Sequence, residues 1–99
     1  MPLFLVNARD KANSIDLRLA NREDHLAWAA NYLDRIAMAG PVTLDDGETM
    51  AGSTFVIAFD TLDDAKAWAA EDPYAQAGLF ESTEIRPFKW LIGDGPGNG

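Results

Sequence analysis

The amino-acid sequence predicts an α+β fold in which four strands and two helices follow one another in the order β-α-β-β-α-β. Three observations indicate this order: apolar runs of strand length, two stretches with apolar residues at helical spacing, and turn-forming glycine or proline residues between them. In the ferredoxin-like arrangement that this order favours, an antiparallel four-stranded sheet carries both helices on one face.

The four strands are recognised by bulky apolar residues without a helical period. The first is predicted over residues 2–9, where Leu-Phe-Leu-Val follows an edge-tolerated proline. The second and third, over 42–44 and 52–59, flank the Asp-Asp-Gly-Glu cluster at 45–48, which favours a hairpin because glycine tolerates a positive φ angle. The fourth strand is predicted within 79–92.

The first helix is predicted to begin after Asn21, a capping residue, and to continue to about Ala39. Gly40-Pro41 then supplies a helix stop. Six residues recur at the spacing of one helical face, and we expect this face to pack on the sheet. These residues are Leu26, Ala29, Ala30, Leu33, Ile36 and Ala37.

The second helix is predicted to begin after Thr61, with Asp64 at the third helical position, and to end at Asp72-Pro73. Residues 73–77 have room for one more helical turn. Residues 10–20 show no clear period and are left as a connection that can contain a helical turn.

Composition predicts one soluble domain. With 99 residues the chain supports a single core, which we place in residues 1–92, followed by a glycine-rich tail at 93–99 that we expect to be flexible. The chain has no cysteine, which excludes disulfides and a cysteine nucleophile. The apolar amino end is too short for a signal peptide, so a cytoplasmic location is the default expectation.

The net charge is -8, because eight Lys and Arg residues stand against 16 Asp and Glu residues. Such a field repels phosphate backbones and anionic lipid headgroups. Neither nucleic acid nor a membrane is therefore expected as a partner.

Both faces of the predicted sheet are apolar. In the first strand Leu3 and Leu5 point to one face while Phe4 and Val6 point to the other, and 55–59 alternate in the same way. Because the helices cover only one face, the other would expose a large apolar patch, and this predicts a homodimer through the sheet faces. A monomer with an unusually apolar sheet, or a cover formed by the loop around 10–20, remains the alternative.

Few residues in the chain have the chemistry of a catalytic group. His25 is the only histidine, and it falls on the flank of the helical apolar stripe, where it can reach a cleft and act as an acid or base. A lone helical histidine is also often a surface or structural residue. Asp72 is a turn residue by position, but beside His25 it would accept the second imidazole N–H and fix the tautomer.

Three further residues are candidates for substrate binding. Arg22 can meet an anion, and Ser53 and Tyr74 can hydrogen-bond a substrate, although both also have ordinary structural roles. The sequence has no glycine-rich phosphate loop, no nucleophile elbow, and one histidine without cysteine, so neither a metal nor another cofactor is predicted.

An ordered series of short motifs resembles the YciI-like (YCII-related) protein family along nearly the whole chain. The resemblance implies the dimeric α+β barrel superfamily and a His-Asp dyad, which falls on His25 and Asp72. Glu23 follows the motif arginine where family members often have proline. The motifs are Asp10-Lys11, Arg-Leu-Ala-Asn-Arg-Glu-Asp-His-Leu at 18–26, Ala39-Gly40-Pro41, Gly52-Ser53, Asp72-Pro73-Tyr74 and Ala77-Gly78-Leu79.

Two functions are compatible with the sequence. The first is a small cofactor-independent enzyme with lyase- or isomerase-like chemistry, in which His25 moves a proton on a small cyclic or phenolic substrate and Asp72 orients it. The resemblance favours this class, since relatives are associated with dehydrochlorination of aromatic breakdown products. The second is a non-catalytic small-molecule-binding or accessory homodimer, in which the pair is a buried structural hydrogen bond.

Overall fold

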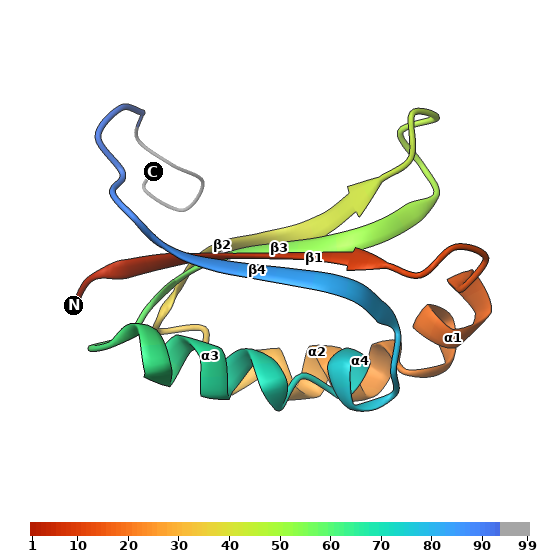
Figure 1. The fold of residues 1–99 in the computed structure, drawn as a ribbon, viewed down its shortest axis with the longest axis horizontal. Coiled ribbons are helices and arrows are strands. Elements are labelled where there is room, and N and C mark those ends of the chain that lie inside the picture. Colours follow the sequence, from red (N-terminus) through yellow and green to blue (C-terminus); the bar gives the residue numbers. More distant parts are fainter. Residues whose placement is uncertain (94–99) are drawn as a thin grey trace.

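A computed structural model of the chain describes residues 1–93, so the predicted tail lies outside the described residues from position 94 onward. The sheet has four antiparallel strands in the order β2-β3-β1-β4, and all helices lie on one side of it (Figure 1). This is the predicted ferredoxin-like α+β fold, with two additional short helices. The elements are β1 (Leu3–Asp10), α1 (Ile15–Ala20), α2 (Arg22–Ala30), β2 (Ile36–Thr43), β3 (Met50–Ala58), α3 (Leu62–Ala70), α4 (Pro73–Gln76) and β4 (Phe80–Phe88).

The core lies between the sheet and helices α2 and α3. Strand β1 is central: Val6 pairs with Phe55 of β3 on one side and with Ile85 of β4 on the other. Its alternate residues Phe4 and Val6 are buried under the helices together with the aromatic residues of β3 and α3. Full burial of such a side chain stabilises the fold by about 1.5–3 kcal/mol, so this face holds the layers together.

The second half of the chain follows the prediction closely. The Thr61 side chain accepts a hydrogen bond from the Asp64 backbone N–H at 3.1 Å and caps α3. The chain then makes the extra turn α4, whose first residue is Pro73. Proline is suited to this position because the N–H that it lacks would have no partner inside the helix.

The first helix was predicted too long. Helix α2 ends at Ala30 rather than near Ala39, and residues 36–43 form β2 instead of the helix end and the short strand predicted at 42–44. Gly40-Pro41 lies inside this strand. Because β2 is at the edge of the sheet, Pro41 can lack an N–H there without breaking the ladder to β3.

The helical face that packs on the sheet also differs from the predicted stripe. Leu26 and Leu33 are 48% and 69% exposed, whereas His25 is buried and Trp28 and Tyr32 pack against the core. The Trp28 ring stacks on Trp68 of α3 with 4.4 Å between ring centroids. The helix is therefore rotated so that its aromatic side chains, which bury more area than alanine or leucine, reach the core.

The sheet face opposite the helices is partly apolar and is not covered by a helix of the described chain (Figure 1). The strand registers place Leu5 beside Val56 on this face, with Met38 beyond Val56. The β2–β3 hairpin and the segment after β4 project on this side of the sheet. We call this surface the back face, and its apolar residues are Leu3, Leu5, Met38, Val42, Val56, Ala58 and Phe88.

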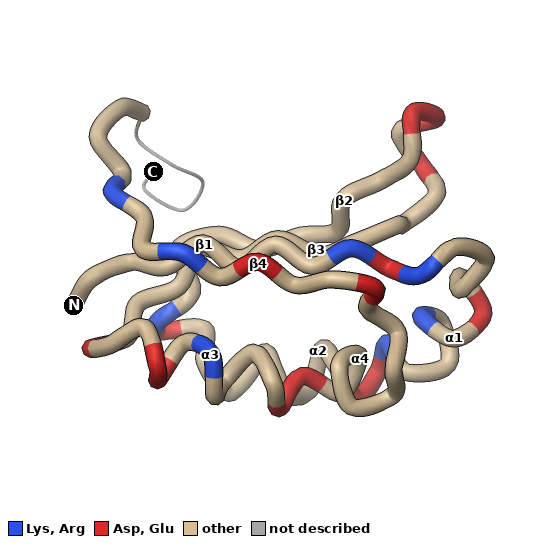
Figure 2. Tube along the Cα trace, viewed as in Figure 1, with Lys and Arg blue, Asp and Glu red and all other residues tan. Residues whose placement is uncertain are grey.

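Many of the charged residues are exposed, whereas Arg18, Asp10 and Asp72 are buried. Figure 2 shows acidic residues on the helical layer and at the tip of the β2–β3 hairpin, where Asp46 accepts the backbone N–H groups of Glu48 and Thr49. The Thr49 hydroxyl, which also donates to Asp46, and the two backbone N–H groups lower the pKa of the Asp46 carboxyl group. Among the helices of residues 1–93, none is long and apolar enough to cross a membrane.

Gly52 allows β1 and β3 to approach closely, and its substitution should show this. A Cβ at position 52 would lie 2.5 Å from the Ala8 carbonyl oxygen, so Gly52→Ala should destabilise the fold by about 1–3 kcal/mol. Gly40→Ala is the matched control, because a Cβ there meets nothing within 4 Å. Urea unfolding of both variants measures the difference, and equal stabilities would contradict the close-approach argument.

Candidate active site

The fold brings His25 and Asp72 into contact. His25 Nδ1 lies 2.8 Å from Asp72 Oδ1, and the two residues are only 8% and 2% exposed. Asp72 precedes α4 and its Oδ1 also accepts the Tyr74 backbone N–H at 2.9 Å, which fixes the carboxylate. Because an ionised carboxylate only accepts hydrogen bonds, we assign the imidazole hydrogen to Nδ1, leaving Nε2 unprotonated in the neutral ring.

Tyr74 holds the imidazole in place from a second direction. Its ring stacks on the His25 ring with centroids 4.0 Å apart and an angle of 15° between the planes. The guanidinium carbon of Arg18 lies 4.6 Å from the centroid of the same tyrosine ring. The His25 ring is therefore positioned by a hydrogen bond at one nitrogen and by an aromatic surface.

Arg18 is a buried cation that is not among the site residues predicted from the sequence. It forms a two-point ion pair with Asp10, with Nε 2.7 Å from Oδ2 and Nη2 2.9 Å from Oδ1, and Nη2 also donates to Ser53 Oγ at 3.0 Å. Burial alone would lower the pKa of Arg18, but the hydrogen bond and charge of Asp10 raise it above its ordinary value. Arg18 is therefore charged although it is only 2% exposed.

A cavity of about 450 Å³ lies between α2 and strands β2 and β3, and it gathers these groups. Its polar wall contains His25, Arg18, Arg22, Ser53 and Tyr74. All predicted site residues except Asp72 line this cavity, and Asp72 is bonded to His25 behind the wall. A volume of this size is typical of small-molecule sites.

The rest of the cavity wall is apolar. It includes the side of α2 that was expected to pack on the sheet, and this explains why Leu26 and Leu33 are exposed. A ligand therefore meets hydrogen-bonding groups on one side and hydrocarbon on the other. The apolar lining residues are Leu26, Ala29, Ala30, Leu33, Ile36, Ala39, Gly40, Pro41, Met50 and Phe55.

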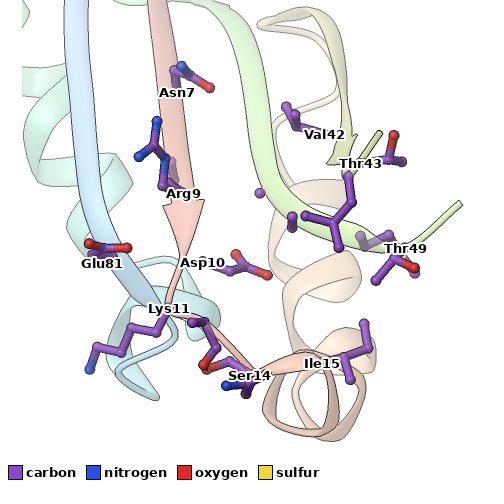
Figure 3. A pocket seen from close by; sticks show the side chains of 17 residues that line it. Asn7, Arg9, Asp10, Lys11, Ser14, Ile15, Val42, Thr43, Thr49 and Glu81 are labelled. Atoms are coloured by element: carbon purple, nitrogen blue, oxygen red, sulfur yellow. The ribbon is translucent and has the colours of Figure 1, made fainter. Parts of the chain in front are cut away.

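A second cavity, of about 590 Å³, lies between the end of β1 and the β2–β3 hairpin (Figure 3). It contains neither His25 nor Asp72, and the carboxylate of Asp10, which lines it, is already paired with Arg18. The Asp10–Arg18 pair thus links the two cavities, each partner lining one of them. The 450 Å³ cavity holds the acid-base groups and is the candidate active site.

No group of three His, Cys, Asp or Glu side chains suited to hold a metal ion occurs in residues 1–93. The polar side chains that line the site can transfer protons and form hydrogen bonds.

Comparison with known proteins establishes the family. The model of the YCII-related domain matches residues 2–89. The chain belongs to the YCII-related domain family. Protein YciI of Escherichia coli O6:H1 is 38% identical over 94 residues, which covers 88% of this chain and 96% of that protein. An uncharacterized protein of Haemophilus influenzae is 38% identical over 93 residues, covering 87% and 95%.

Solved structures of similar proteins confirm the fold. The 5-chloro-2-hydroxyhydroquinone dehydrochlorinase TftG of Burkholderia phenoliruptrix, in complex with 2,5-dihydroxybenzoquinone, has a TM-score of 0.80 and 29% identity, and covers 93% of this chain and 96% of that one. An antibiotic biosynthesis monooxygenase has a TM-score of 0.56 at 7% identity, covering 93% and 100%. The latter likeness concerns the fold alone.

The protonation of Tyr74 should contribute to stability at alkaline pH. Burial raises the pKa of the Tyr74 phenol above its ordinary value of 10.0, against the opposing effect of the Arg18 charge. The folded chain therefore holds this proton more tightly than the unfolded chain. The contribution is complete below about pH 10 and is lost as the pH rises through the higher folded pKa. Urea unfolding of the wild type and Tyr74→Phe between about pH 9 and 11 measures it. The wild type should lose more stability than the variant, and parallel curves would refute the assignment.

Proposed function

We propose that this protein is a small cofactor-independent enzyme that performs acid-base chemistry, of the lyase or isomerase kind, on a small cyclic or phenolic substrate. The observation that carries the proposal is the buried hydrogen bond between His25 and Asp72 at the wall of the 450 Å³ cavity. This arrangement leaves one imidazole nitrogen for a substrate while the other is held by a carboxylate, as a general base requires.

In the proposed reaction Nε2 of His25 takes a proton from the substrate. The C–H or O–H bond breaks, its electron pair stays on the substrate, and the imidazole becomes a cation that the Asp72 carboxylate stabilises. In an isomerisation the same proton returns to another atom of the substrate. In an elimination the electron pair forms a double bond and expels a leaving anion, such as the chloride implied by the name of TftG.

The cavity wall supports a flat, oxygen-bearing ring as the substrate. Phe55 and the alanines of α2 offer apolar contacts to ring faces, while Ser53 and Tyr74 offer polar groups for ring oxygens. Arg22 is an exposed residue of the cavity lining, and in this proposal it meets an anionic substituent of the substrate. The quinone bound by the related TftG is a ligand of this chemical kind.

A non-catalytic binding protein is the second candidate. It is favoured by the depth at which the pair is buried and by the structural role of Asp72, which caps α4 through the Tyr74 N–H. In that case the main role of His25 would be to donate a hydrogen bond to the buried Asp72 carboxylate.

Conservative replacement of the pair separates the two functions. His25→Gln and Asp72→Asn should lower turnover of hydroxylated or chlorinated hydroquinones and quinones by about 10²–10⁴-fold, as loss of a general base does, while the melting temperature changes little. Asp63→Asn, an exposed substitution on α3, is the control. Turnover is followed by absorbance and chloride release. Unchanged turnover, or loss of folding together with loss of ligand binding, would favour the structural role.

We further propose that two copies pair through the back face. That face presents apolar residues from all four strands, and Met38, Val42 and Phe88 are exposed on it. Such a pairing would form the dimeric α+β barrel that the family resemblance implies. A second copy supplies an apolar sheet of matching shape by symmetry, which satisfies the isologous contact of a twofold dimer.

The mass of the protein in solution tests the pairing. The wild type should elute as a dimer in light-scattering chromatography, and Met38→Glu together with Phe88→Glu should shift it to a monomer because a charge in a dry interface is unfavourable. Leu19→Glu is the control, because Leu19 is an exposed residue of α1 away from the back face, and this variant should remain a dimer. A monomeric wild type would end the proposal.

A further inference from the structure

We infer that Arg18 and Ser53 form a binding subsite for one ionised ring oxygen, a phenolate or enolate, inside the candidate active site. The inference extends the proposed function by naming the group that the cavity recognises. The binding step itself does not depend on catalysis by His25.

The hydrogen-bond partners of Arg18 leave donors for a ligand. A guanidinium has five N–H groups, and here Nε and Nη2 are directed at Asp10 and Ser53. None of these hydrogen bonds within residues 1–93 uses Nη1, although Tyr74 lies close enough to the guanidinium to raise its pKa, and Nη1 is not sealed inside the protein. Because Arg18 lines the cavity, Nη1 is the part of the buried group that remains for an acceptor there.

Ser53 supplies a second donor at the same place. Its Oγ accepts a hydrogen bond from Arg18 Nη2 at 3.0 Å, so the hydroxyl hydrogen remains available to donate. Ser53 is buried and also lines the cavity. Because the Arg18 guanidinium and the Ser53 hydroxyl are hydrogen-bonded to each other, each can direct one hydrogen at the same ligand oxygen. Two donors directed at one oxygen stabilise an oxyanion.

The charge balance selects the class of anion. Asp10 neutralises the formal charge of Arg18, so the subsite offers directed hydrogen bonds without a large excess of positive charge. A doubly charged phosphate would need more positive charge than this pair supplies. A single delocalised oxyanion on a flat ring fits better, because the remaining wall of the cavity is apolar.

Tyr74 sets the spacing between this subsite and the base. The Arg18 guanidinium carbon and the His25 ring each lie within 5 Å of the Tyr74 ring centroid, at 4.6 and 4.0 Å. The guanidinium carbon of Arg18 and the centre of the His25 ring are therefore less than about 9 Å apart, within the reach of a single small substrate. In the proposed reaction, His25 removes a proton from a carbon beside a ring carbonyl. The electron pair of the C–H bond forms a C=C bond, the C=O pair moves to the oxygen, and Arg18 and Ser53 hold the resulting enolate.

Binding of para-nitrophenol tests the subsite without turnover, because its phenol and phenolate forms absorb differently. Wild-type protein and His25→Gln should both lower the apparent pKa of the bound dye by about one unit or more, a tenfold preference for the phenolate. Ser53→Ala should reduce this change in the apparent pKa of the dye. If the dye keeps its free pKa when wild-type protein is saturated with it, the inference is wrong.

Removal of Arg18 alone would strand the buried Asp10 charge, so the pair is replaced together. Arg18→Met with Asp10→Leu removes both charges, a change that folds tolerate better than loss of one partner, and circular dichroism checks the fold. This variant should bind the dye without a pKa shift. Arg35→Met is the matched control, because Arg35 also packs on an aromatic ring, Phe59, but lines neither cavity.

The outcomes separate this inference from the proposed function. A shift that persists in the folded double variant would refute the role of Arg18 and leave the His25 proposal intact. A shift that depends on Arg18 in a protein that turns over no ring substrate would support the subsite and refute catalysis.

Discussion

The carboxylate of Asp72 is the constraint on which the geometry of the site depends. One oxygen accepts both the Tyr74 backbone N–H and the His25 ring, so the start of α4, the tyrosine and the helix α2 are held relative to one another. The group is 2% exposed, and an unpaired carboxylate at this depth would be costly. The same bonds that satisfy this buried charge also orient the imidazole toward the cavity.

The cavity exists because of how α2 is rotated. The helix directs Trp28 into the core, where it stacks on Trp68, and Tyr32 follows in the turn after the helix. The side of α2 with Ala29 and Ala30 is left facing β2 and β3. Small side chains on that side do not fill the space above the strands. Packing of large aromatic residues on one helical face thus leaves an apolar hollow beside the other.

Two buried pairs of opposite chemistry meet at Tyr74. In the proposed reaction the His25–Asp72 pair exchanges a proton with the substrate. Arg18 keeps its charge, because burial would lower the pKa of the guanidinium but the hydrogen bond and charge of Asp10 raise it. In this proposal the two groups next to Tyr74 have different roles: the His25 imidazole moves a proton, and the Arg18 guanidinium holds negative charge on the substrate. The chain as a whole has a net charge of -8, yet the buried Arg18 places a positively charged hydrogen-bond donor in the wall of this cavity.

The sequence by itself determined the order of the elements, because alternation in 52–59, the Thr61 cap and the Asp72-Pro73 break are local signals that survive in the fold. It also supplied His25 and Asp72 as candidates. Local signals failed where tertiary contacts decide: Gly40-Pro41 resembles a helix stop but lies in an edge strand, where the missing N–H is tolerated. The stripe of Leu26 and Leu33 resembles a core face but lines a cavity.

Only the tertiary structure decided that Arg18 belongs to the site. It lies eight residues from Asp10 and thirty-five from Ser53 along the chain, and residues 10–20 have no period that would indicate burial. Its position depends on β1 ending beside β3 and on α1 folding back over them. The physical reason is that a buried charge is stable only where distant groups converge to satisfy it, and such convergence is not encoded in any local pattern.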